Sequence, residues 1–283
     1  MEKIHLYVAE TDHPQGSKTD IVLKDEITQE ELSQLNSAFR VCSLYHSITQ
    51  IKDIVIENGE SFKRFMTPQN LKVLREHNIS PEKSIMLANK SVLNYASSIK
   101  TFIDMEKRLL TKHSTSDAVK IFEDMQHLFY DKYVEYRFWA NFRNYIVHCE
   151  FPYSIYQESI ETGCKIICTK EQLLQFDNWK HSKKDIQEME SQIDLPSLVD
   201  NMSGMIYAFY IDFFRHFAND ITDGIKTYGE FCRKYDVRVP VIFKLKSKEI
   251  VEGSHFQPLP VKELKASFDI LTSNPNVTMN ITN

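Results

Sequence analysis

Residues 80–110 of the chain read SPEKSIMLANKSVLNYASSIKTFIDMEKRLL. Ser80 followed by Pro81 favours a helix start, because the serine can cap free backbone N–H groups and proline suits the first helical position. Apolar residues then recur mostly every three or four positions, which is typical of one buried helix face. They are Ile85, Ala88, Val92, Ala96, Ile99, Phe102, Ile103 and Leu109. This stretch therefore predicts a long amphipathic helix.

Similar stripes predict three further long helices, over residues 28–58, 116–151 and 195–228. Thr28 with Glu31 three residues later has the spacing of a capping box, so we expect the first of them to begin at Thr28. Four helices of this length are expected to pack antiparallel, with crossing angles of roughly 20°.

Helix breakers are scarce and support the same interpretation. The 283 residues include 7 glycines and 9 prolines, which favours long helices over many short strands. Asn58 and Gly59 form the predicted end of the first helix. Pro152 ends the third, because the residue before a proline avoids the α conformation.

Short β segments are predicted between and after these helices. Residues 154–168 have the pattern of a β-hairpin. Within residues 237–245 apolar side chains alternate strictly, the period of a half-buried strand, and Pro240 favours an edge position for it. Residues 277–281 alternate likewise, and a short strand is predicted near residues 4–8.

The predicted fold is therefore mainly α: an antiparallel long-helix bundle with an inserted β-hairpin and a small C-terminal β appendage. Residues 1–27 form an N-terminal extension in this interpretation. The bundle covers residues 28–236, with the hairpin inserted near 154–168, and the appendage covers residues 237–283.

Composition narrows the class of protein. The formal net charge is −5, which argues against a protein that coats long nucleic acid electrostatically. Five cysteines at irregular spacing favour a reducing compartment over a disulfide framework. The longest apolar run, residues 205–214, is short and contains Asp212, and the N-terminus has no apolar signal core. We expect a cytoplasmic protein without a membrane partner.

The third predicted helix contains an arginine at an apolar position. Its stripe runs through Phe122, Met125, Phe129, Tyr133, Tyr136 and Ala140. The same steps lead next to Arg143 and Val147. We therefore expect Arg143 on a buried face, where an unpaired charge is costly and needs a carboxylate, a second subunit or a phosphate as partner.

Arg143, Asn144 and His148 suit one reaction in particular. RNA is cleaved when its own 2′-hydroxyl attacks the adjacent phosphorus, which requires proton transfer and positive charge at the phosphate. Histidine serves as acid or base near neutral pH, and the arginine fork matches phosphate oxygens. Asn144 can orient a non-bridging oxygen and shares a helix face with His148. This chemistry requires no metal or cofactor.

The segment Phe142-Arg143-Asn144-Tyr145-Ile146-Val147-His148 resembles the signature of the HEPN superfamily. That signature is an arginine, a polar residue, and a histidine after four to six intervening residues; here there are four, and the polar residue is Asn144.

The resemblance implies an α-helical bundle, usually a homodimer, with the motif at the dimer cleft. It also implies metal-independent endoribonuclease activity on single-stranded or loop RNA, in toxin–antitoxin or antiviral defence, with an antitoxin or sensor protein as a further partner. In one subgroup a modified tyrosine lies two residues after the histidine, whereas this chain has Glu150 there.

Other interpretations of these residues stay open. Arg143, Asn144 and His148 are also compatible with structural roles: an interhelical salt bridge, a capping contact and a helix-end histidine. A non-catalytic interaction module is one rival. A nucleotide-binding regulator using Arg143 and the basic residues of 226–248 is another. A zinc site that includes His148 is disfavoured, because Cys164 and Cys168 on one strand lie roughly 13 Å apart.

Overall fold

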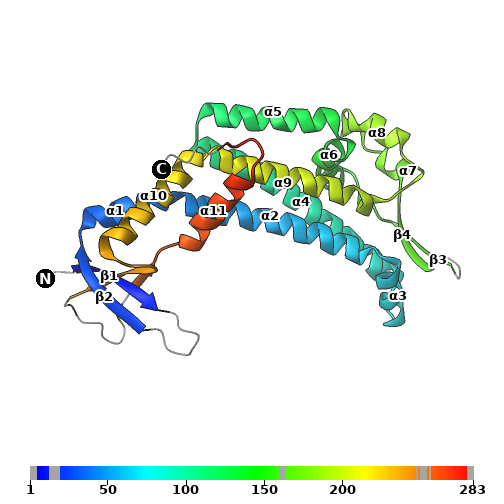
Figure 1. Ribbon diagram of the computed structural model, residues 1–283. Helices are drawn as coiled ribbons and strands as arrows, with labels where there is room; N and C mark the ends of the chain where they lie inside the picture. Colours follow the sequence, from blue (N-terminus) through cyan, green and yellow to red (C-terminus); the bar gives the residue numbers. More distant parts are fainter. Residues whose placement is uncertain are drawn as a thin grey trace. The chain divides into compact units, whose positions relative to one another are not determined.

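The computed structural model describes residues 5–12, 20–159, 163–246, 248, 254 and 256–278 (Figure 1). It is mainly helical with small antiparallel sheets, which confirms the predicted α class. The chain divides into two compact units. The helical unit contains residues 48–213, and the mixed unit contains residues 1–47 and 214–283. No helix among the described residues combines the length and the apolar character needed to cross a bilayer.

The helical unit is built from helices with a small hairpin. Its elements are α3 (Pro68–Glu76), α4 (Pro81–His113), α5 (Ser116–Lys132), α6 (Val134–His148), β3 (Ile155–Ser159), β4 (Gly163–Thr169), α7 (Lys170–Leu173), a 3₁₀ turn (Asp177–Trp179), α8 (Ser182–Glu188), β5 (Gln192–Ile193) and a second 3₁₀ turn (Leu195–Leu198). Helices α2 (Arg40–Phe65) and α9 (Val199–Arg215) belong to it for most of their length. The antiparallel pairing of β3 with β4 confirms the predicted hairpin.

Helix α4 follows the sequence prediction closely. Ser80 is its N-cap and accepts a hydrogen bond from the backbone N–H of Lys83, with Pro81 in the first turn. The predicted apolar stripe is buried at Ala88, Val92 and other positions down to Leu109. Helices α5 and α6 both contact α4.

Gly59 does not end a helix, contrary to the prediction. Helix α2 continues through it to Phe65. A Cβ atom at Gly59 would lie 2.9 Å from the Tyr95 ring and 2.9 Å from a methyl group of Val199. Glycine is therefore needed here for close packing of α2 against α4 and α9, and its low helix propensity is overridden by the packing.

The third predicted helix is two helices. Tyr133 has an extended backbone, with φ −118° and ψ 122°, and separates α5 from α6. The predicted stripe crosses this break, so its phase does not carry over from one helix to the other. The first and fourth predicted helices are also divided, near Phe39 and Phe217.

The mixed unit joins both ends of the chain in one sheet. Its strands are β1 (His5–Asp12), β2 (Asp20–Ile27), β6 (Pro240–Leu245) and β7 (Phe256–Pro258), in the order β2-β1-β6-β7, and all pairs are antiparallel. Its helices are α1 (Gln29–Ala38), α10 (Ala218–Tyr235) and α11 (Val261–Ser273). Helix α10 contacts both of the others.

Three sequence predictions can be compared with this unit. The Thr28–Glu31 capping box is confirmed, with both reciprocal hydrogen bonds present at the start of α1. The edge position predicted from Pro240 is wrong, because β6 pairs with β1 and with β7; proline is tolerated as the first residue of the strand. Residues 277 and 278 are not in a strand, and 279–281 lie outside the described residues.

The two ends of the chain are not separate segments, as they were in the predicted fold. Strand β1, from the predicted N-terminal extension, pairs with β6, from the predicted C-terminal appendage. The two segments therefore belong to one sheet, and residues 237–283 add helix α11 as well as strands.

Glu106 of α4 is a carboxyl group buried in the helical unit. Its residue is 1% exposed, and its Oε2 atom has no hydrogen-bond partner among the described residues. Burial raises the pKa of this carboxyl well above its ordinary value, and the negative charge of Asp212 on α9 raises it further. The folded chain therefore favours a protonated Glu106.

This burial predicts a pH-dependent stability. Above the unfolded-state pKa of about 4.3, folding takes up a proton at Glu106, so its contribution to stability falls as the pH rises toward the raised folded-state pKa. This loss lowers the free energy of unfolding by up to about 1.4 kcal/mol per pH unit. Glu106→Gln is neutral at every pH, so we expect the variant to lack this part of the pH dependence. Urea unfolding of both proteins between pH 5 and 8 measures it. Parallel curves for the two proteins would contradict the prediction.

Candidate functional site

Helix α6 has one buried face and one exposed face. Aromatic side chains form most of the buried face: Phe138, Trp139, Phe142 and Tyr145. Two of them, Phe138 and Tyr145, stack with the buried Trp179, and each of their ring centres lies 5.5 Å from that of Trp179. This aromatic packing fixes the rotation of α6 about its axis. It thereby determines which residues face the solvent.

The exposed face of α6 contains all three residues predicted as a site. Ala140, Arg143, Asn144, Val147 and His148 are exposed, and they follow the spacing of one helix face. At about 100° per residue, Arg143 and His148 lie at the two edges of this face, with Asn144 between them. Arg143 and His148 are separated by roughly 7.5 Å along the helix axis.

The predicted burial of Arg143 is therefore wrong. The stripe that leads to it, through Ala140 to Val147, is the exposed face of α6, and Val147 is 53% exposed. The error comes from carrying the phase of α5 across the break at Tyr133. Among the described residues, no hydrogen bond or ion pair engages the side chain of Arg143, Asn144 or His148.

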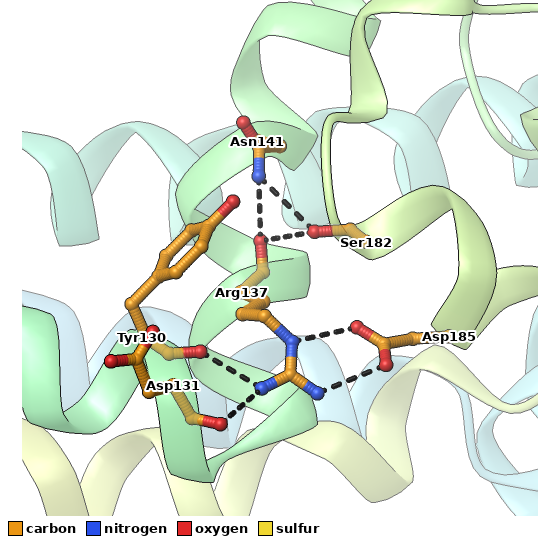
Figure 2. A network of polar contacts seen from close by, with 6 residues as sticks. All are labelled: Tyr130, Asp131, Arg137, Asn141, Ser182 and Asp185. Carbon is orange, nitrogen blue, oxygen red and sulfur yellow. Dashed lines mark hydrogen bonds and ion pairs between the residues drawn. The ribbon is translucent and has the colours of Figure 1, made fainter.

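A different arginine on α6 has the structural role (Figure 2). Arg137 forms a two-point ion pair with Asp185 of α8, with N–O distances of 2.8 and 2.9 Å. Its Nη1 atom also donates to the backbone carbonyls of Tyr130 and Asp131, at 2.8 and 2.9 Å. These carbonyls lie in the last turn of α5, where a helix leaves its acceptors unpaired. Arg137 therefore stabilises the end of α5 at the break.

The same network continues through α6 to α8. Asn141, which is 5% exposed, donates to the Arg137 carbonyl and to the Ser182 hydroxyl. Ser182 in turn donates to the Arg137 carbonyl at 2.9 Å. The network holds α6 and α8 together. Arg143 lies on the opposite side of α6 and takes no part in it.

Arg143 and Asn144 line a surface hollow of about 180 Å³. Its floor is apolar and its rim is mostly polar. The floor is formed by Ile99, Ile103, Tyr136, Trp139 and Met202, and the rim by Lys100, Gln126, Ala140, Arg143 and Asn144. His148 does not line the hollow and lies about one turn beyond Asn144. Sequence reasoning missed Lys100 and Gln126, which come from α4 and α5.

His148 is the last residue of helix α6. Cys149 is the C-cap, and its backbone N–H donates to the Tyr145 carbonyl at 2.8 Å. The Cys149 side chain is exposed, but partial burial and the charge of Glu150 raise the pKa of its thiol. The raised pKa argues against a reactive thiolate at this position. His148 is therefore the residue here that is suited to proton transfer.

The cysteines of the hairpin do not join His148 in a cluster. Cys164 and Cys168 are buried on β4, with three residues between them, while Cys149 is exposed at the end of α6. Within the part of the chain that the structure describes, no three His, Cys, Asp or Glu side chains are grouped closely enough to hold a metal ion.

The basic residues of 226–248 belong to the mixed unit, whereas Arg143 belongs to the helical unit. Lys234 of this basic stretch is already paired with Glu31.

Comparison with known proteins found no match. No protein-family model matches the chain, no curated protein is similar to it in sequence, and no solved structure matches its fold. The function is therefore inferred from the chemistry and geometry of the residues alone.

Proposed function

We propose that this protein is a metal-independent endoribonuclease of the HEPN type, with Arg143, Asn144 and His148 as its site residues. One observation carries the proposal: all three side chains lie on the exposed face of α6, and none of them is engaged by another described side chain. A structural arginine would be expected to have partners such as those of Arg137.

In this proposal an RNA phosphate binds on the exposed face of α6 and is attacked there by the neighbouring 2′-oxygen. A phosphate bound over Asn144 would be flanked by Arg143 on one edge and by His148 on the other. The 2′-oxygen attacks phosphorus, and the bond from phosphorus to the 5′-oxygen breaks. The products are a 2′,3′-cyclic phosphate and a 5′-hydroxyl. Arg143 stabilises the added negative charge on the phosphate, and Asn144 orients a non-bridging oxygen.

Two protons move in this reaction, and one histidine does not easily transfer both at once. The 2′-hydroxyl loses a proton and the departing 5′-oxygen gains one. A homodimer that brings two copies of the α6 end together would supply a second His148, one for each transfer. The exposed position of His148 at the helix end is compatible with such a pairing.

RNA cleavage is expected to be unchanged by excess EDTA. The proposed chemistry uses a guanidinium and an imidazole, and neither requires a metal ion. The assay is the cleavage of a labelled single-stranded RNA with and without EDTA, followed by readdition of Mg²⁺. Activity lost with EDTA and restored by Mg²⁺ would overturn the mechanism, because it would assign the charge at the phosphate to a metal ion.

A further inference from the structure

The hollow beside Arg143 has the features of a binding site for one flat, polar-edged ring. Its floor contains the buried side chains of Ile99, Trp139 and Met202 and the half-buried side chain of Ile103. These provide an apolar surface that a planar ring can cover. The volume of about 180 Å³ is below the range of roughly 300–1,000 Å³ typical of sites for larger ligands. It suits a single ring system rather than a longer segment.

The rim of the hollow offers hydrogen bonds of both kinds. Gln126 from α5 and Asn144 from α6 each have an amide, which contains two N–H donors and one carbonyl acceptor. Burial raises the pKa of the Tyr136 hydroxyl, and the Gln126 side chain lies close enough to that hydroxyl to oppose the shift. Base edges in RNA are recognised by such donors and acceptors, together with contact to the ring face.

The rim also carries positive charge. Lys100 is paired with Asp104 one turn later on α4, at 2.5 Å, so its charge is largely compensated. Arg143 has no such partner among the described residues. The hollow has an apolar floor, amide groups at its edge and a guanidinium beside it. These features match a ligand in which a phosphate is joined to a heterocyclic base.

We propose that this hollow binds the base of one nucleotide of single-stranded RNA, next to the phosphate that Arg143 contacts. The inference rests on the proposed function and specifies its substrate contact. An inorganic phosphate would leave the apolar floor uncovered, and an apolar ligand would leave Arg143 and both amides unpaired. A nucleotide has a group for each part of the site: a ring face for the apolar floor, polar ring edges for the amides and a phosphate for Arg143.

Nucleotide binding tests the inference without any cleavage. The probes are the four nucleoside 3′-monophosphates, with ribose 5-phosphate as the probe that lacks a base. We expect isothermal titration calorimetry to show at least one nucleotide binding about tenfold more tightly than ribose 5-phosphate, because only the nucleotide has a base to cover the apolar floor. Equal binding of ribose 5-phosphate, or no binding of any nucleotide, would overturn the inference.

Two variants locate the binding. Ala140→Leu adds a side chain at the exposed rim of the hollow, and we expect it to weaken nucleotide binding by about tenfold. Thr101→Leu is the matched control: it adds apolar bulk at an exposed position of α4 that does not line the hollow, and it should bind as the unmodified protein does. Nucleotide binding that Ala140→Leu leaves unchanged would show that the base does not occupy the hollow.

Cleavage kinetics separate this inference from the proposed function. If both hold, Ala140→Leu raises the KM for RNA by about tenfold and changes kcat less than about twofold. Cleavage with an unchanged KM would overturn the base site and leave the ribonuclease proposal standing. Nucleotide binding that depends on Ala140, in a protein that cleaves no RNA, would support the base site and overturn the ribonuclease proposal.

Discussion

His148→Ala is expected to lower the rate of RNA cleavage by about 10²–10⁴-fold, the usual contribution of a general acid or base. Arg143→Ala is expected to lower it by a comparable factor, because it removes the charge that stabilises the crowded phosphate. Both side chains are exposed, so neither change should alter the free energy of unfolding by more than about 0.5 kcal/mol. Cleavage rates and urea unfolding are measured on the same preparations.

Matched controls make this result specific. His46 on α2 and Arg108 on α4 are also exposed, and neither is part of the proposed site. His46→Ala and Arg108→Ala should cleave RNA at the rate of the unmodified protein. Folded His148→Ala and Arg143→Ala proteins that keep full activity would rule out the assigned roles. Equal losses in the control variants would point to a nonspecific effect of charge.

Arg137→Ala is expected to have the opposite effect, lowering the free energy of unfolding by about 3 kcal/mol. The side chains of Arg137 and Asp185 are 14% and 16% exposed, so removing the guanidinium leaves a mostly buried carboxylate without its partner. The change also leaves the carbonyls of Tyr130 and Asp131 without this donor at the end of α5. Urea unfolding of Arg137→Ala beside Arg143→Ala measures the contrast.

A double variant tests the reason for this loss. If the unpaired Asp185 carboxylate causes much of it, Arg137→Ala combined with Asp185→Ala should lose less stability than the two single changes added together. Additive losses would mean that the ion pair itself contributes little. A stable Arg137→Ala protein beside a strongly destabilised Arg143→Ala protein would exchange the roles of the two arginines.

Local signals predicted much of the helical architecture. The Ser80-Pro81 start of α4 and the Thr28–Glu31 capping box are recognisable because each depends on residues a few positions apart. The break at Tyr133 lacks such a signal, since the contacts found there join Arg137 to the end of α5 and to Asp185, which is 48 residues away. Long-range partners of this kind are not visible in the spacing of one sequence.

The same limit applies to Gly59 and Pro240. Both are breakers by local propensity, and both are explained by their surroundings: Gly59 by the Tyr95 ring and the Val199 methyl group that approach it, and Pro240 by its place at the first position of β6. Tertiary packing overrides propensity at these positions.

The sequence alone draws attention to the proposed site residues, but it did not predict where they lie. Arg143, Asn144 and His148 attract notice through their chemistry and spacing, but the assumed stripe put Arg143 on the wrong face of α6. The aromatic residues at 138, 139, 142 and 145 were the signal for the true buried face, because they recur at helical spacing within α6 alone. Lys100 and Gln126 of the hollow come from two other helices, and no motif links them to Arg143.

The chemical ends of the cleaved RNA test the central claim most directly. A labelled single-stranded RNA is incubated with the protein in EDTA, and the product ends are identified by mass spectrometry, beside a second RNA in which the nucleotides at the cleavage sites carry 2′-deoxyribose. The proposed mechanism predicts 2′,3′-cyclic phosphate and 5′-hydroxyl ends, and no cleavage at the 2′-deoxy positions. Products with 3′-hydroxyl and 5′-phosphate ends, cleavage at the 2′-deoxy positions, or an RNA left intact would contradict it.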